Sequence, residues 1–96
     1  MSRRVTILGA TGSVGQNTVD LISRMPQRYD VVALSGGRNI IRLAQQAIAL
    51  RPEVVVTAFE ECLDDLRTAL QGTGIEAAAG QWALIEAAAR PADWTM

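Results

Sequence analysis

The chain has 96 residues, with nine basic and ten acidic side chains, a formal net charge of −1, and enough hydrophobic residues (49%) to form a core. This length fits one small domain, and the charge balance excludes the basic surface of a nucleic-acid-binding protein. Because histidine is absent and Cys62 is the single cysteine, a Cys/His metal site is excluded within these residues. The sequence has neither an apolar run of about 20 residues, as a membrane helix requires, nor a signal-peptide pattern. We therefore expect a cytoplasmic globular domain without nucleic-acid or membrane partners.

The first half of the chain predicts two strand–helix units. An apolar run at residues 5–8 predicts a strand, and apolar residues at helical spacing predict a helix over 13–25 that ends before Pro26. A second strand is expected at 31–35, and a second helix begins after Asn39, a favourable N-cap residue. The expected apolar faces comprise Val14, Thr18, Leu21, Ile22 and Met25 in the first helix and Ile41, Ala44, Ala47 and Ile48 in the second.

The second half continues the alternation. The β-branched run at 54–56 predicts a strand that is covered on both faces. Thr57 and Glu60 have the spacing of a capping box and predict the start of a third helix. A short strand near 75–78 and an alanine-rich helix at 81–89 are expected to follow. The apolar stripe expected on the third helix comprises Phe59, Leu63, Leu66 and Leu70.

Strands that alternate with helices in this way predict parallel βαβ units with right-handed crossovers. The fold class is therefore α/β, a Rossmann-like parallel sheet with flanking helices and about four βα units. The first strand is expected to be innermost, with the second and third stepping outward from it. Trp82 is expected to pack the last helix onto the sheet.

Gly9, Gly12 and Gly15 form a G-x-x-G-x-x-G pattern between the first strand and the first helix. A strand that turns through glycines into a helix places backbone N–H groups around a bound phosphate. The pattern differs from the common G-x-G-x-x-G because position 10 is alanine, but the strand before it and the helix after it are the required context. The sequence therefore predicts a dinucleotide site, and a purely structural glycine-rich turn is the alternative.

The segment after the second strand, Ser35-Gly36-Gly37-Arg38-Asn39, indicates which dinucleotide is bound. NAD-preferring sites have an acidic residue near this point that binds the ribose hydroxyls, but no Asp or Glu occurs between residues 31 and 52. The Arg38 guanidinium suits a 2′-phosphate, to which it can donate two charge-assisted hydrogen bonds. The segment therefore predicts NADP, and the alternative is an arginine exposed at a helix start.

Together these segments resemble the 1-deoxy-D-xylulose 5-phosphate reductoisomerase family, whose pattern is G-[SA]-T-G-S-[IV]-G followed by A-L-x-[AG]-[GN]-[KR]-N. Residues 9–15 and 33–39 match both halves, and the resemblance continues to residues 92–96. It implies an NADPH-dependent oxidoreductase that converts 1-deoxy-D-xylulose 5-phosphate to 2-C-methyl-D-erythritol 4-phosphate in bacterial isoprenoid precursor biosynthesis. It also implies a sugar-phosphate substrate, Mg²⁺ or Mn²⁺ as the metal, and a homodimer.

The resemblance also implies which residues bind the cofactor and which functions lie elsewhere. Arg38 stands where many members have lysine and keeps the charge, and Gly36 replaces a common alanine, which we expect to matter little. No catalytic residue and no metal ligand is expected within these 96 residues. The residues implied at the pyrophosphate and its ribose are Thr11, Gly12, Ser13 and Val14, and those at the 2′-phosphorylated adenosine are Gly37, Arg38 and Asn39.

By the same resemblance, residues 1–96 are the N-terminal portion of an NADPH-binding domain, and the catalytic and C-terminal domains are absent. The short strand near residue 75 would lie at the far edge of the sheet, and Trp94 would begin another central strand. The strand expected beyond Met96 would pair with the free side of the first strand. Without it, Val5–Leu8 would be an exposed apolar edge, and the chain alone is predicted to be inactive.

Three other interpretations remain open at this point. The chain could belong to another NADP-dependent oxidoreductase, similar to aspartate-semialdehyde dehydrogenases, to a non-catalytic NADP-sensing module, or to a self-contained small nucleotide-binding module.

The acidic group Glu60, Glu61, Asp64 and Asp65 could bind Mg²⁺, but its position at the start of a helix favours interaction with the helix dipole.

Overall fold

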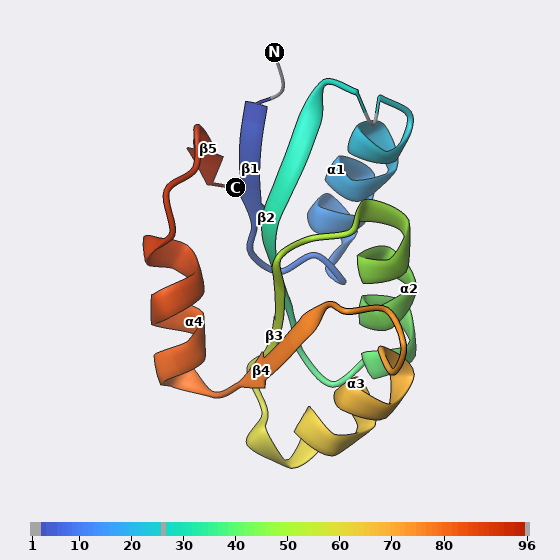
Figure 1. The fold of residues 1–96 in the computed structure, drawn as a ribbon, viewed down its shortest axis with the longest axis vertical. Helices are drawn as coiled ribbons and strands as arrows, with labels where there is room; N and C mark the ends of the chain where they lie inside the picture. Colours follow the sequence, from blue (N-terminus) through green and yellow to red (C-terminus); the bar gives the residue numbers. More distant parts are fainter. Residues whose placement is uncertain (1–2, 26, 96) are drawn as a thin grey trace.

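The computed structural model describes residues 3–25 and 27–95, and these form a single parallel sheet between two helical layers (Figure 1). Pro26 and Met96 lie outside the described residues. The strands are β1 (Arg3–Ile7), β2 (Tyr29–Gly36), β3 (Val54–Thr57), β4 (Glu76–Ala79) and β5 (Trp94–Thr95). The helices are α1 (Ser13–Ser23), α2 (Ile40–Leu50), the short 3-10 helix η1 (Glu60–Cys62), α3 (Leu63–Ala69) and α4 (Gln81–Ala89).

The strand order is β4-β3-β2-β1-β5, and each neighbouring pair is parallel. This confirms the Rossmann-like fold class, the outward stepping from the first strand, and the place of the short strand at the edge. The prediction that Val5–Leu8 forms an exposed edge is wrong. Val5 and Thr6 pair with Trp94 and Thr95 of β5, so β1 is an inner strand and its residues 5–7 are buried.

The helices are divided unequally between the two faces of the sheet. Figure 1 shows α1, α2 and α3 on one side and α4 on the other. The larger core, on the side of α1 to α3, includes Ile7, Leu34, Leu43 and Leu66, all at most 1% exposed. The smaller core packs Ala87 of α4 against β2 and β3. Trp82 takes no part in it: contrary to expectation it is 83% exposed, and Ala83, Leu84 and Ala87 make the contact of α4 with this core.

A bulge in β2 decides which of its residues face each layer. Val5 pairs with Val31 and Thr6 pairs with Ala33, so Val32 is an extra residue in β2. Regular alternation along a strand would place Val31 and Ala33 on the same face. Because of the bulge, Val31 and Leu34 enter the larger core, and Val32 and Ala33 enter the smaller one.

The predicted apolar faces of the first two helices are partly wrong. In α2, Ile41 and Ile48 are 74% and 44% exposed, and in α1 Leu21 is 55% exposed. Each of the two helices has more hydrophobic residues than one face can bury. Their spacing is therefore consistent with two overlapping apolar faces. Ile22, Ala44 and Ala47 are buried as predicted, but the other buried residues lie one position before or after a predicted one. Among the side chains that the structure describes, the buried ones are Val19 and Ile22 in α1, and Ile40, Leu43, Ala44, Gln46 and Ala47 in α2.

The predicted capping box of Thr57 and Glu60 is also wrong. Thr57 is the last residue of β3, and its hydroxyl donates to the carbonyl oxygen of Gly37 at 2.9 Å. The Thr57 hydroxyl oxygen also accepts from the backbone N–H of Phe59 at 3.3 Å. The chain then forms η1 before α3 begins, because Thr57 is held by the sheet and by the neighbouring loop.

Candidate dinucleotide site

The turn from β1 to α1 has the backbone geometry that a phosphate turn requires. Gly9 adopts a positive φ of 73°, and its carbonyl oxygen accepts from the N–H of Gly12 at 3.1 Å. Gly12 is the N-cap of α1, in an extended conformation and without a side chain to cap the helix. The first N–H groups of a helix have no partner within it, and the first turn of α1 contains no acidic residue. An anion is therefore a suitable ligand at this helix end.

The glycines of the turn have different functions. A Cβ atom on Gly15 would lie 2.1 Å from the carbonyl oxygen of Gly9 and 2.8 Å from the Cα of Ala10. Glycine at position 15 therefore allows α1 to approach the turn. A Cβ atom on Gly12 would meet only the Gly9 oxygen, at an ordinary 3.5 Å. Position 12 thus tolerates a side chain in the folded chain and leaves the space beside the helix end open for a ligand.

The turn is tied to its surroundings by polar side chains that the sequence patterns did not reveal. The N–H of Gly9 donates to the hydroxyl of Ser35 at 2.9 Å, and the N–H of Ala10 donates to the carbonyl of Ser35 at 2.7 Å. The side-chain amide of Gln16 donates to the carbonyl of Thr11 at 2.8 Å. A serine at the end of a strand is a weak signal in a sequence, because a chain has many such serines and only the fold shows which one is adjacent to a turn.

The second predicted segment lies directly beside the turn. A Cβ atom on Gly36 would lie 3.3 Å from the Thr11 methyl group and 3.1 Å from a methyl group of Leu43. The two sequence motifs therefore meet at the carboxyl end of β1 and β2. Glycine in place of alanine at position 36 was expected to matter little, but the space around this position is tight. An alanine there would require its neighbours to shift by a few tenths of an ångström.

Arg38 and Asn39 follow at the start of α2. Asn39 caps the helix as predicted, since its Oδ1 accepts from the N–H of Arg42 at 3.2 Å. The Arg38 guanidinium lies 3.9 Å from the centre of the Phe59 ring and forms an ion pair of 3.5 Å with Glu61. Its side chain is 64% exposed, so a ligand can reach it.

The structure brings Thr11, Gly12 and Gly37 to one end of the sheet with Arg38. Gly37 is held there by the Thr57 hydroxyl bond to its carbonyl. Ser13 and Val14 are the first two residues of α1, and their side chains lie outside what the structure describes. Their backbone places them in the first helical turn, beside Gly12.

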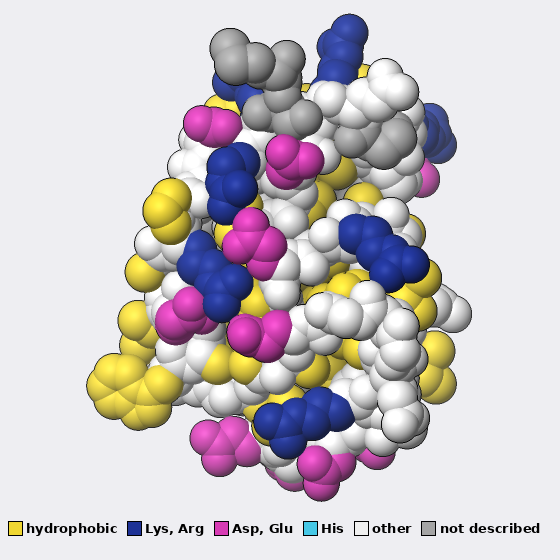
Figure 2. Space-filling view, viewed as in Figure 1, with side chains coloured by type: hydrophobic (Ala, Val, Ile, Leu, Met, Phe, Trp, Pro, Cys, Tyr) yellow, Lys and Arg dark blue, Asp and Glu magenta, His cyan; other side chains and the backbone are white. Residues whose placement is uncertain are grey.

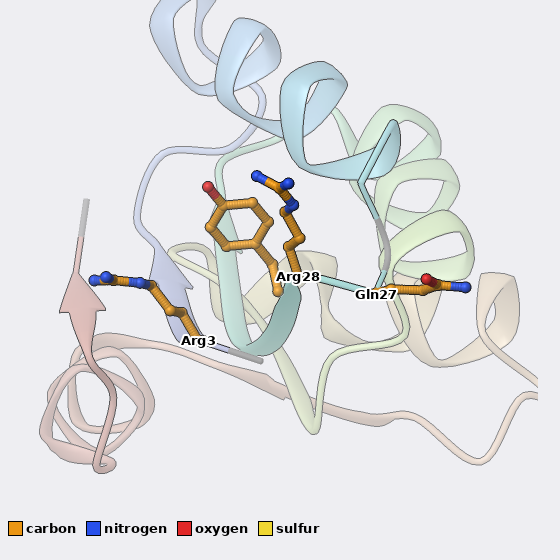
Figure 3. Close-up of a pocket in the computed structure, with 4 residues that line it drawn as sticks. Arg3, Gln27 and Arg28 are labelled. Atoms are coloured by element: carbon orange, nitrogen blue, oxygen red, sulfur yellow. The ribbon is translucent and has the colours of Figure 1, made fainter. Parts of the chain in front are cut away.

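Two further features concern metal binding and the opposite end of the sheet. Among residues 3–25 and 27–95, the structure has no group of three or more acidic, histidine or cysteine side chains that could hold a metal ion. A shallow hollow at the opposite end of the strands is lined by Arg3, Gln27, Arg28 and Tyr29. Figure 3 shows Arg3 extending toward β5 and Gln27 extending the opposite way, and Arg3 lies over the Trp94 ring at 4.6 Å.

The surface charge agrees with the balanced composition. On the face shown in Figure 2, basic and acidic side chains alternate, and no large area carries one charge. Within the described part of the chain, no helix has the length and apolar character needed to cross a membrane.

Comparisons with known proteins give the family. Residues 5–96 match the family model described as 1-deoxy-D-xylulose 5-phosphate reductoisomerase. Proteins of that name from Ruegeria pomeroyi and Paracoccus denitrificans are 67% identical over 94 residues and 59% identical over 96 residues. Each match covers 98% of this chain, and 24% and 25% of the respective relative. The chain thus spans about a quarter of the length of the curated relatives it matches.

Solved structures agree with the family match. The chain superimposes with a TM-score of 0.97, at 49% identity, on the reductoisomerase from Zymomonas mobilis in complex with NADPH, covering 99% of this chain and 25% of that one. A second reductoisomerase, solved with NADPH, fosmidomycin and magnesium, gives a TM-score of 0.87 at 28% identity and covers 97% of this chain and 23% of that one. The sequence motifs, the fold and these matches lead to one conclusion: the chain belongs to the 1-deoxy-D-xylulose 5-phosphate reductoisomerase family.

Proposed function

We propose that these 96 residues are the N-terminal portion of the NADPH-binding domain of a reductoisomerase. The whole protein would convert 1-deoxy-D-xylulose 5-phosphate to 2-C-methyl-D-erythritol 4-phosphate. The observation that carries the proposal is the proximity of Thr11 and Gly36, which brings the glycine turn and the cationic segment together at the carboxyl edge of the sheet. Ligands of parallel α/β sheets bind at this edge.

NADPH fits the residues at this edge. The backbone N–H groups of Ser13 and Val14 would bind the pyrophosphate, because the first N–H groups of a helix have no partner within it. Gly12, whose own N–H donates to the Gly9 carbonyl oxygen, would let the pyrophosphate approach the helix end. Thr11 would contact the adjoining ribose. When bound, NADPH supplies a hydride for the reduction of the substrate.

The adenosine end would lie over the second segment. The Arg38 guanidinium would donate to the 2′-phosphate, and its exposed position beside the β2 end makes it reachable. Gly37 would let the adenosine approach the backbone, and the side-chain amide nitrogen of Asn39 would donate to it. The segment from Val31 to Pro52 contains no acidic residue that would repel a 2′-phosphate.

Other features of the whole enzyme belong to the same proposal. The substrate is a sugar phosphate, Mg²⁺ or Mn²⁺ is bound by ligands outside this chain, and the protein is a cytoplasmic homodimer. The magnesium in the solved relative supports the metal.

The test is the substitution Arg38→Ala in the full-length protein, with NADPH and NADH affinities measured by fluorescence titration. A hydrogen bond to a charged group contributes roughly 1.5–3 kcal/mol, so NADPH binding should weaken by about one to two orders of magnitude. NADH binding should barely change. Equal losses for both cofactors would mean that Arg38 acts on the fold or on the shared pyrophosphate, and the NADP assignment would fail.

A further inference from the structure

The Phe59 ring packs against Arg38, the residue proposed to bind the 2′-phosphate. The centre of its ring lies 3.9 Å from the Arg38 guanidinium carbon, and its Cε2 would lie 3.6 Å from a Cβ atom on Gly37. The ring therefore contacts two residues of the loop between β2 and α2, Gly37 and Arg38. A guanidinium over an aromatic face is attracted by the electron density of the ring, and this contact restricts an otherwise flexible side chain.

The position of Phe59 is fixed from the neighbouring strand. The Thr57 hydroxyl accepts from the N–H of Phe59 at 3.3 Å and donates to the carbonyl of Gly37 at 2.9 Å. One side chain at the end of β3 thus links the loop that contains the ring to the loop that contains the arginine. The relative position of Arg38 and Phe59 is built into the folded chain before any ligand binds.

Glu61 forms an ion pair with the same guanidinium. Its carboxylate lies 3.5 Å from Nη1 of Arg38, and both side chains are 64% exposed. A 2′-phosphate that approaches Arg38 must displace this carboxylate or bind beside it, and two anions at one guanidinium repel each other. The Glu61 carboxylate therefore competes with the 2′-phosphate for Arg38.

We propose that Phe59 and Glu61 together set how strongly this protein distinguishes NADPH from NADH. Phe59 is a positioning residue that holds Arg38 in place for the 2′-phosphate. Glu61 is a specificity-determining residue that lowers the affinity for the 2′-phosphorylated cofactor by pairing with Arg38 when the site is empty. The inference rests on the proposed function, because it assumes that Arg38 binds the 2′-phosphate.

Two substitutions in the full-length protein should shift NADPH affinity in opposite directions. Phe59→Leu keeps an apolar side chain but loses the aromatic face, so NADPH should bind about two- to fivefold more weakly. Phe59→Tyr should restore wild-type binding. Glu61→Gln removes the competing charge, so NADPH should bind about two- to fivefold more tightly. NADH affinity should stay constant in all three.

The control for charge is Glu60→Gln, because the Glu60 carboxylate lies toward Gly80 and not toward Arg38. It should leave the ratio of NADPH to NADH affinity unchanged. The effect of Glu61→Gln should also disappear when Arg38 is replaced by alanine, since the competition acts through that guanidinium.

Adenosine 2′,5′-bisphosphate and adenosine 5′-monophosphate serve as small probes of the same end of the site. Their affinity ratio, measured by calorimetry, should follow the NADPH to NADH ratio in every variant. If Arg38→Ala changes this ratio but Phe59→Leu and Glu61→Gln do not, the inference is overturned and the proposed function stands. If Arg38→Ala itself leaves the ratio unchanged, the proposed function fails and the inference fails with it.

Discussion

The side-chain amide of Gln46 donates to the carbonyl oxygen of Ala10 at 2.8 Å, across 36 positions of the sequence. This bond joins the middle of α2 to the glycine turn between β1 and α1. Gln46 is only 8% exposed and Ala10 is fully buried, so solvent cannot replace the bond. The second helix therefore helps to hold the shape of the candidate phosphate turn.

Gln46→Leu should destabilise the protein and weaken cofactor binding. The Ala10 carbonyl would lose its donor, at a cost of about 1–3 kcal/mol. Part of this is offset, because Gln46 Oε1 is buried without a partner in the described structure and would also be removed. We expect the free energy of unfolding to fall by about 1 kcal/mol in urea titration. The neighbouring exposed residue gives the control: Gln45→Leu should change stability little, and an equal loss there would contradict the assigned tether.

Gly12→Val and Gly15→Ala should separate ligand exclusion from folding. At position 12 a Cβ atom meets only an ordinary contact of 3.5 Å, so Gly12→Val should fold, with an unchanged circular dichroism spectrum. The isopropyl group should block the pyrophosphate and abolish NADPH binding.

At position 15 a Cβ atom would lie 2.1 Å from the Gly9 carbonyl oxygen. Even Gly15→Ala should therefore lower thermal stability markedly, through displacement of α1 from the turn. Unchanged NADPH affinity in Gly12→Val would refute the phosphate-turn interpretation, whatever Gly15→Ala does.

Arg90→Met should weaken the end of the sheet where β4, β3 and α4 meet. The Arg90 guanidinium pairs with Glu86 at 2.8 Å, Glu76 at 3.4 Å and Glu53 at 3.6 Å. The hydrogen bond with Glu86 is the main cause that raises the pKa of Arg90, and the charges of Glu76 and Glu53 add to it. Because the acidic partners are half exposed, we expect a loss of about 1 kcal/mol in the free energy of unfolding.

Salt provides the check on this ion network. The difference between wild type and Arg90→Met should shrink as ionic strength rises, because salt screens charges that are exposed to solvent. Arg24→Met is the matched control: Arg24 pairs with Asp20 at 2.9 Å, but both side chains are more than 60% exposed. A loss in Arg24→Met as large as that in Arg90→Met would show that the network adds nothing beyond single surface pairs.

The 96-residue chain alone should not turn over 1-deoxy-D-xylulose 5-phosphate with NADPH and Mn²⁺. The chain spans about a quarter of the length of its curated relatives, and the metal ligands proposed for the whole protein lie outside it. Mn²⁺ should also leave its thermal unfolding midpoint unchanged. Turnover by the purified chain, after mass spectrometry has excluded longer protein, would show that the chemistry lies within these residues.

The strand order and the candidate site could be predicted because local and global signals agree. The apolar run before Gly9 and the N-cap residue Asn39 determine where elements begin, and parallel alternation leaves few possible topologies. Gly12 and Arg38 lie at the same sheet edge, since both follow the carboxyl ends of parallel strands.

The predictions that were wrong concern contacts that depend on a neighbouring helix, strand or loop. Thr57 has capping-box spacing, but its hydroxyl bonds to the Gly37 carbonyl, which is 20 positions away in the sequence. Ile41 lies on an apolar stripe of α2, but the sheet contacts the stripe next to it. Phe59 belonged to a predicted helical stripe, and its contact with Arg38 depends on the adjacency of two loops that periodicity cannot show.

The different surroundings of the two tryptophans determine what their fluorescence can report. Trp82 is 83% exposed, so its indole is already hydrated and its emission should change little when the chain unfolds. Trp94 is 39% exposed, with the Tyr29 ring centre 6.0 Å away and the Arg3 guanidinium 4.6 Å from its ring. A change in the tryptophan emission spectrum therefore reports the separation of β5 from β1. A thermal unfolding curve of this chain followed by tryptophan fluorescence measures the loss of one edge of the sheet, not of the interior.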